Sequence, residues 1–227
     1  FNNEINETKN CIEKSKNDVN YISSYHTHKL NNRIEFLIEC GYINKDGNTI
    51  TDAGNVARLL QEVPGLLFGK LLVETNFLDT LTEIDCIILF STINNVRVRE
   101  EFKRNNHHYI QNSNTVEVCG AINKLVSIND DILSHATRRG IIPYEEELNY
   151  DVMEYIIEWV HVKTESECHG IINKMTCESE IFLGEFIKTI IKINNICEEM
   201  KKVAEYFQRV DFLNKLSKIS GLILKFV

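Results

Sequence analysis

The chain has 227 residues, of which 43% are apolar and 26% are charged. These fractions are typical of a globular protein and exclude an intrinsically disordered chain, a collagen-like chain and a disulfide-stapled mini-protein. Twenty-five basic side chains against 33 acidic ones give a formal net charge of -8, which argues against a nucleic-acid binder that depends on bulk attraction to phosphate.

The composition also bears on location. No window approaches the roughly 18 uncharged apolar residues of a membrane-spanning helix, so no membrane span is expected. The seven cysteines are widely spaced and form no Cys-x-x-Cys pair, which favours reduced thiols in an intracellular compartment.

The chain starts without an initiator Met or a leader, which indicates a piece of a longer protein. Heavy use of Ile and Asn is typical of an AT-rich genome, such as that of a parasite or a large virus.

The sequence predicts an all-α fold, because two prolines and ten glycines leave long stretches uninterrupted. In the first 29 residues, Ile5, Ile12, Val19 and Ile22 recur at near-heptad steps among polar side chains. This pattern indicates an exposed or coiled-coil-like helix that depends on a partner helix.

A helix, a tight hairpin and a second helix are expected next. An apolar helical face starts at Leu30 and ends at Gly41, a residue suited to a helix C-terminus. Residues 42–51 surround an Asp-Gly turn, the signature of a hairpin, and Thr51 or Asp52 then caps a helix. This order predicts a small winged-helix-like start to a multi-helix bundle.

The remainder of the chain is predicted to be helical apart from one long loop. Helices are expected around residues 66–72 and 84–90, and then at 116–139, 149–162, 164–173, 178–208 and 210–225. Residues 94–114 are polar and are predicted to form a surface loop or insertion. This loop holds the densest basic cluster of the chain, which is Arg97, Arg99, Lys103 and Arg104. A solvated basic loop is the commoner role for such a cluster, and nucleic-acid contact is the alternative.

No local motif for catalysis is present. The chain lacks a phosphate-binding Gly-x-x-x-x-Gly-Lys loop, a dinucleotide fingerprint, an Asp-Glu-x-His box, a Gly-x-Ser-x-Gly elbow and a His-Glu-x-x-His pair. We therefore assign no catalytic residue and expect no ATP hydrolysis by these residues alone. Potential metal ligands occur at His26 with His28, His107 with His108, and Cys168-His169 with Cys177. None has the spacing of a zinc site, so no metal site is predicted.

One helix carries the best candidate for nucleic-acid contact. Lys188, Lys192 and Asn195 stand at i, i+4 and i+7, so they share one face of the helix expected at 178–208. Such a row of ammonium groups could follow a nucleic-acid backbone. The alternative is an ordinary exposed lysine edge on a core helix.

Five strings in register resemble a known family, the DSHCT domain of Ski-like DExH-box RNA helicases of superfamily 2. The strings are residues 34–43, 51–57, 71–82, 148–160 and 172–176, and the likeness covers about residues 30–225. The resemblance implies a DSHCT-like helical domain at 30–227, with residues 1–29 as a linker or as the helix returning from a stalk or arch insertion.

The resemblance also implies a function. The domain would pack on two RecA-like motor domains absent from this chain and help to enclose single-stranded RNA, which exosome-like RNA-decay proteins would receive. No cofactor is implied for this chain, whereas ATP and Mg²⁺ would be bound by the parent helicase. Lys188 and Lys192 match the two basic positions of the family's RNA-facing helix, with Asn195 as a polar neighbour. The family has arginines there, which stack on bases more readily than lysines do.

A second reading of the same sequence remains open. The chain could be a stand-alone helical scaffold that binds a protein partner and has no role with RNA. On that reading the net charge of -8 needs no explanation.

Overall fold

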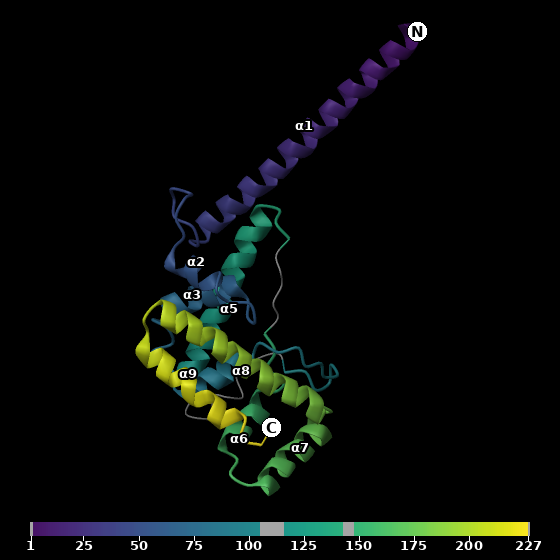
Figure 1. The fold of residues 1–227 in the computed structure, drawn as a ribbon. Coiled ribbons are helices and arrows are strands. Elements are labelled where there is room, and N and C mark those ends of the chain that lie inside the picture. The colour runs from purple at the N-terminus through teal and green to yellow at the C-terminus, as the bar shows by residue number, and fades with distance from the viewer. Residues whose placement is uncertain (1, 105–115, 143–147, 227) are drawn as a thin grey trace.

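The computed structural model describes residues 2–104, 116–142 and 148–226. The elements within them are α1 (Asn2–Glu39), α2 (Asp52–Ala57), α3 (Gly65–Glu74), α4 (Glu83–Ser91), α5 (Val116–Arg138), α6 (Met153–His161), α7 (Glu165–Ser179), α8 (Leu183–Tyr206) and α9 (Val210–Ile223). These residues contain no β-strand, which confirms the predicted all-α class. Helix α1 extends away from a body that the other helices form (Figure 1).

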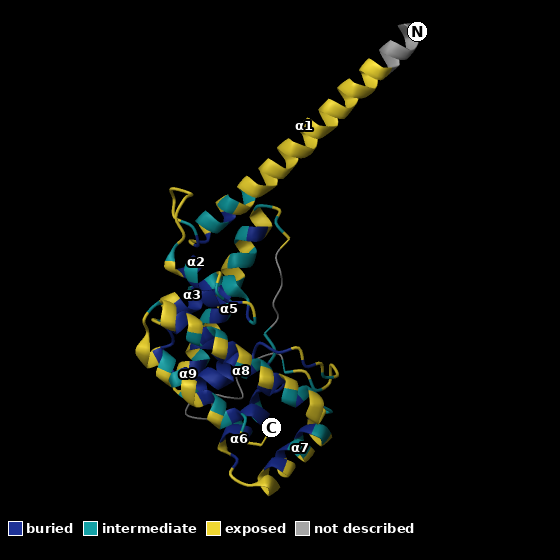
Figure 2. Cartoon of the chain, viewed as in Figure 1, coloured by how far each residue is buried: buried dark blue, intermediate teal, exposed yellow. Residues whose placement is uncertain are grey.

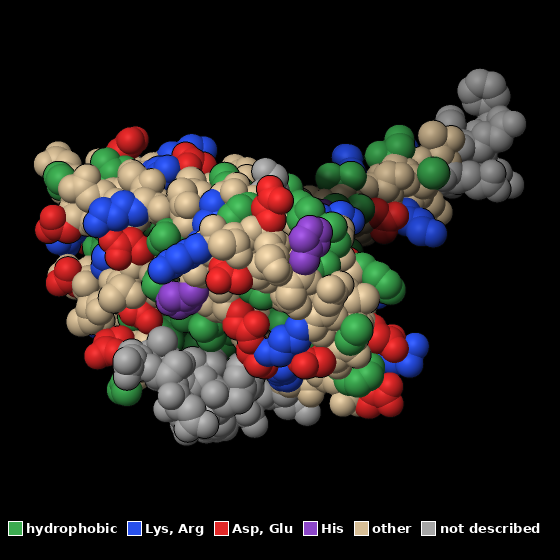
Figure 3. Space-filling model, turned by 90° about the horizontal axis from the view of Figure 1, so that it is seen from below, with side chains coloured by type: hydrophobic (Ala, Val, Ile, Leu, Met, Phe, Trp, Pro, Cys, Tyr) green, Lys and Arg blue, Asp and Glu red, His purple; other side chains and the backbone are tan. Residues whose placement is uncertain are grey.

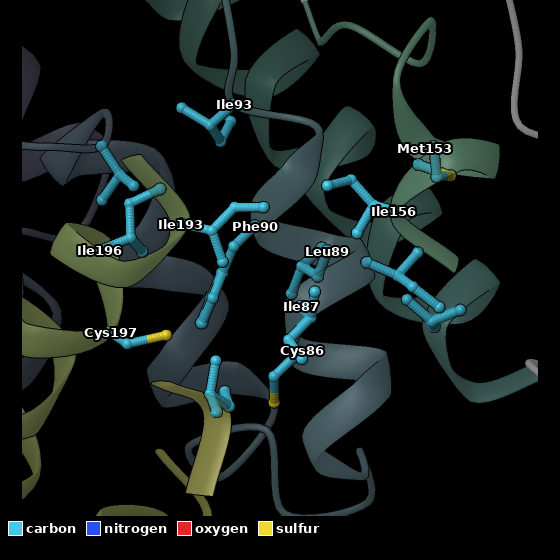
Figure 4. Close-up of a cluster of buried hydrophobic side chains, with 14 of the residues drawn as sticks. Cys86, Ile87, Leu89, Phe90, Ile93, Met153, Ile156, Ile193, Ile196 and Cys197 are labelled. Carbon is cyan, nitrogen blue, oxygen red and sulfur yellow. The ribbon is translucent and has the colours of Figure 1, made fainter. Parts of the chain in front are cut away.

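Helix α4 lies at the centre of the main core. Every residue from Asp85 to Ser91 is buried, so this short helix is enclosed on all sides, as is typical of a central core helix. It contacts α5, α6, α8 and α9, and Figure 4 shows side chains of α6 and α8 converging on it. Its first turn is fixed by a capping box in which the Asp85 carboxylate accepts the backbone N–H of Thr82 at 2.9 Å.

The predicted hairpin is present in a minimal form. Gly41 ends α1 with a φ of 79°, and one antiparallel bridge pairs Ile43 with Ile50. The Thr51 side chain accepts the backbone N–H of Gly54 and so caps α2, as the sequence predicts. The winged-helix likeness of this helix, hairpin and helix stays a prediction.

Three predicted helix boundaries are wrong, and one of them is the start of α8, which lies at Leu183 rather than at 178. Helix α6 begins at Met153 rather than at 149, because the Asn149 side chain and backbone donate to the carbonyl oxygens of Val96 and Thr92. Helix α7 continues past 173 to Ser179 and ends only where Glu180 adopts a φ of 54°. The predicted loop at 94–114 lacks helix and strand in residues 94–104, and residues 105–114 lie outside the described part of the chain.

Helix α1 is exposed over most of its length, as the sequence predicts. Side chains from residue 8 to residue 31 are exposed, and the helix runs through residues 29 and 30 without a break (Figure 2). Packing begins near its end, where Phe36 and Cys40 join a small apolar cluster with Tyr42, Ala53 and Ala136. The body therefore holds only the last two turns of α1.

An arginine that follows α5 fastens this end of α1. The guanidinium of Arg139 donates to both carboxylate oxygens of Glu39, at 2.9 and 2.6 Å, and to Glu35 at 2.6 Å. Asn32 joins the contact by donating its amide N–H to the Arg139 carbonyl at 2.9 Å. The paired hydrogen bonds to Glu39 have the bidentate geometry that gives an arginine–carboxylate pair its direction.

The Glu39 carboxylate makes this contact sensitive to acid. Its hydrogen bonds from Arg139 lower the pKa of Glu39 from 4.5 to about 2. Because the folded-state pKa is depressed, the stabilising effect is complete above pH 4.5 and disappears as the pH falls through about 2. We expect the difference in urea midpoint between the wild type and Glu39→Gln to shrink over that interval. Glu13→Gln, at an α1 carboxylate without an ion pair among the described residues, is the control, and an equal shrinkage there would contradict the assignment.

Candidate nucleic-acid interface

The predicted lysine row lies on the outer side of α8. Phe186, Ile190 and Ile193 are buried on the inner side of the helix and fix its rotation. Lys188 and Asn195 are exposed and Lys192 is half-buried. The spacing of 3.6 residues per turn thus places all three where the sequence predicts, on one accessible face.

Lys188 and Lys192, but not Asn195, help to form one wall of a cleft of about 260 Å³, whose other wall is the start of the polar loop. The lining residues are Asn94, Asn95, Val96, Glu185, Lys188, Thr189 and Lys192. Within the described part of the chain, neither lysine ammonium group makes an ion pair. The structure therefore brings the lysine row and the polar loop together, two features that the sequence shows far apart, and leaves two cations free to meet an anion.

Hydrogen bonds hold the loop wall in place. Asn94 is buried, and its side chain donates to the Ser91 carbonyl at 2.7 Å and accepts the Val96 N–H at 2.9 Å. The Asn149 amide donates to the Val96 carbonyl at 2.7 Å. A turn stabilised from both sides has little freedom, so this wall of the cleft is preorganised.

The four cations of the predicted basic loop fall into two pairs. Arg99 contacts Glu180 at 2.9 Å and Arg104 contacts Glu154 at 2.6 Å, so both are used in tethering the loop to the body. Arg97 and Lys103 are exposed and make no ion pair with the described residues. Of the four cations, only Arg97 and Lys103 therefore have exposed side chains that are unpaired within the described ranges and could contact a phosphate.

The Arg104 tether belongs to a network on α6 and α7. Burial alone would raise the pKa of Glu154, but hydrogen bonds from Lys174 and Arg104 hold that pKa below its ordinary value. Lys174 also donates to Glu158, at 2.5 Å. Burial raises the pKa of neighbouring Asp151, whose carboxylate accepts the Arg104 backbone N–H at 2.7 Å. These charges compensate one another and stabilise the loop, so Arg104 and Lys174 are engaged by carboxylates and are not free to bind an anion.

A second loop is held near the far end of the row. The Glu199 carboxylate accepts the backbone N–H groups of Gln61 and Glu62, at 2.9 and 2.8 Å. Asn194 accepts a hydrogen bond from Ser220 of α9 at 2.8 Å, whereas Asn195 is exposed. Of the two asparagines, Asn194 therefore joins helices and Asn195 remains available.

An apolar row runs beside the lysine row. Leu183, Ile187 and Ile191 stand at i, i+4 and i+8, and Leu183 and Ile191 are 43% and 45% exposed. Phe182, just before α8, is 65% exposed. Ammonium groups next to apolar and aromatic surface suit a ligand that has both phosphates and flat bases.

Sequence reasoning did not identify Asn94, Asn95, Glu185 or Thr189 as parts of this cleft. Helical spacing could have found Glu185 and Thr189, which share the face of Lys188 and Lys192. No local signal could have found Asn94 and Asn95, because their role depends on a contact with residues some 90 positions away. Charges of both signs are interspersed on the face in Figure 3, so on that face no broad basic field replaces the local row.

The described residues contain neither a candidate metal centre nor a helix that could span a membrane. No group of three His, Cys, Asp or Glu side chains among the described residues could hold a metal ion. His107 and His108, which were weighed as potential ligands, lie outside those residues. No helix in the described ranges has the length and apolar character needed to cross a membrane.

Comparison with known proteins identifies the family. The family model of the DSHCT (NUC185) domain matches residues 47–227, which is more than half of the chain. No curated protein matches the chain. The family is found in Ski-like DExH-box helicases, where it is a helicase-associated C-terminal domain. The chain therefore belongs to the DSHCT domain family, as its five sequence strings predict.

Proposed function

We propose that this domain forms one wall of the RNA channel of an ATP-dependent RNA helicase. The observation that carries the proposal is the cleft on α8, where Lys188 and Lys192 face the loop wall without an ion pair among the described residues. In this role the two ammonium groups contact passing phosphates, and Asn195 donates or accepts as the strand changes register.

The motor chemistry belongs to other domains in this proposal. RecA-like domains of the same protein bind ATP and Mg²⁺ and move single-stranded RNA, and the present domain packs on them. Exosome-like or other RNA-decay proteins receive the strand. The net charge of -8 fits this division of labour, because the motor domains then supply most of the affinity for RNA.

The proposal predicts a measurable loss of affinity when the lysine row changes sign. We expect Lys188→Glu with Lys192→Glu to weaken binding of a labelled oligouridine about ten-fold or more in fluorescence anisotropy. In a plot of log affinity against log salt concentration, each phosphate contact with a single strand contributes about 0.7 to the downward slope. Losing two contacts is therefore expected to reduce that slope by about 1.4.

The matched control reverses two other exposed lysines, Lys45 and Lys163, whose side chains make no ion pair among the described residues. The control has the same net charge as the test variant and is expected to bind almost as the wild type does. Equal losses in the two variants would reduce the effect to bulk charge and contradict the site. Unchanged affinity in the test variant would favour the stand-alone scaffold.

A further inference from the structure

Two tyrosines on the exposed part of α1 form a stacked pair. Tyr21 and Tyr25 stand at i and i+4, their ring centroids are 6.4 Å apart, and their planes differ by 17°. The side chains are 71% and 45% exposed. Each ring presents a broad apolar face, and exposing such a face to water is unfavourable.

A cation continues this row along the helix. The Lys29 ammonium lies 4.6 Å from the centroid of the Tyr25 ring, which is a cation–π contact. Tyr21, Tyr25 and Lys29 therefore follow one another at steps of four residues, and we call them the tyrosine platform. Among the described residues no ring other than Tyr25 and no cation lies against Tyr21, whose side chain is 71% exposed.

The surrounding charge is positive although the chain is acidic. Residues 14–33 carry Lys14, Lys16, Lys29 and Arg33 against the single acid Asp18. None of these cations forms an ion pair with a described residue. An anionic chain approaching the platform therefore meets a local excess of cations in a protein with a net charge of -8.

The Tyr21 ring lies apart from most of the near-heptad apolar row of the same helix. At 100° per residue, Tyr21 is on the side of α1 opposite Ile12 and Val19, whereas Tyr25 and Lys29 lie on the side of Ile22. A partner helix on Ile12 and Val19 would leave the Tyr21 ring exposed. Tyr21 is also about 27 Å along α1 from the end of that helix at Glu39, so the platform is distinct from the cleft on α8.

We propose that the tyrosine platform is a base-stacking site for single-stranded nucleic acid, a second contact in addition to the lysine row. The inference rests on the proposed function in that it assigns the ligand to the same class. The outer face of the Tyr21 ring accepts any base, the Tyr25 ring supports Tyr21 from behind, and the neighbouring lysines meet the phosphates on either side. Because no side chain of the platform reads base edges, the contact is tolerant of sequence.

The test separates bases from phosphates. The 227-residue chain is titrated with a labelled oligouridine of about 20 nucleotides and with a fully abasic oligomer of the same length, which keeps the phosphates. Tyr21→Ala with Tyr25→Ala is expected to weaken oligouridine binding about five-fold or more and to leave abasic binding unchanged. Tyr21→Phe with Tyr25→Phe keeps both rings and should retain the wild-type affinity. Alanine is the best helix former, so α1 persists in the test variant.

The outcomes distinguish this inference from the proposed function. The base-stacking proposal is overturned if the alanine variant binds oligouridine with unchanged affinity, or if it loses affinity equally for both oligomers. Either result would point to a protein contact for Tyr21 and Tyr25. Lys188→Glu with Lys192→Glu should weaken both oligomers, since it removes phosphate contacts. If that variant binds normally while the alanine variant does not, the cleft on α8 is wrong and the platform stands. Absence of any binding by the wild type at low salt overturns both.

Discussion

Replacing Trp159 with alanine is expected to lower the free energy of unfolding by about 3–5 kcal/mol, the range for removing a buried large aromatic side chain. The indole is 2% exposed and packs edge to face on Phe186 of α8, with ring centroids 5.3 Å apart. Its Nε1–H donates to the carbonyl of Ile223 at the end of α9, at 2.9 Å. One side chain of α6 therefore holds α8 and α9, and its loss leaves both a cavity and an unpaired carbonyl.

Urea denaturation followed by far-ultraviolet circular dichroism measures this effect. Trp159→Phe separates the two contributions, because it keeps most of the ring volume and removes the donor. We expect that variant to lose about 1 kcal/mol for the hydrogen bond and a further amount for the smaller ring. A loss below 1 kcal/mol in the alanine variant would mean that α8 and α9 are held by other contacts.

Local rules predict much of this fold. The burial of α4 on all sides follows from its near-continuous apolar run, and its start follows from Thr82 with Asp85 three residues later. Helix α5 was expected at 116–139 and is found at Val116–Arg138. In these segments intrinsic preference, capping and packing favour the same structure, so a single sequence contains enough information.

The boundaries that were missed depend on contacts between distant residues. A helix was expected to end at 173, but the Lys174 ammonium is neutralised by Glu154 and Glu158 of α6, and α7 continues to Ser179. Asn149 was expected inside a helix, but it donates hydrogen bonds to the carbonyl oxygens of residues 92 and 96 and lies before the start of α6. Neither partner can be recognised from the local sequence.

The candidate site divides in the same way. Helical spacing alone placed Lys188, Lys192 and Asn195 on one face, and the exposure of that face agrees. The opposite wall of the cleft could not be predicted, because part of what holds it is the pair of hydrogen bonds that residues 94 and 96 make with the distant Asn149. The sequence also presents the four loop cations as equivalent, whereas Glu180 and Glu154 engage two of them.

Gly54→Ala is expected to destabilise the protein by about 2 kcal/mol, although alanine is the better helix former. A Cβ at this position of α2 would lie 2.3 Å from the Tyr42 carbonyl oxygen and 2.5 Å from the Ile50 side chain. Overpacking of this kind costs about 1–3 kcal/mol and occasionally more, against a gain in helix propensity of about 1 kcal/mol. The contact with a backbone atom puts the cost at the upper end of its range, so the loss exceeds the gain.

The Tyr42 carbonyl has little room to withdraw from the added methyl group. It accepts the Thr51 N–H at 3.0 Å, and the Tyr42 side chain is buried and donates its hydroxyl to the Leu66 carbonyl at 2.7 Å. Gly170→Ala in α7 is the matched control, because a Cβ there meets no atom within 4 Å. That variant should gain up to about 1 kcal/mol of stability from helix propensity alone. Thermal or urea unfolding measures both variants. If the hairpin is held against α2 as tightly as the distances require, the free energy of unfolding falls in Gly54→Ala and rises in Gly170→Ala. A gain of similar size in the two variants would show that the hairpin yields, and that the cluster seating the end of α1 is looser than its burial indicates.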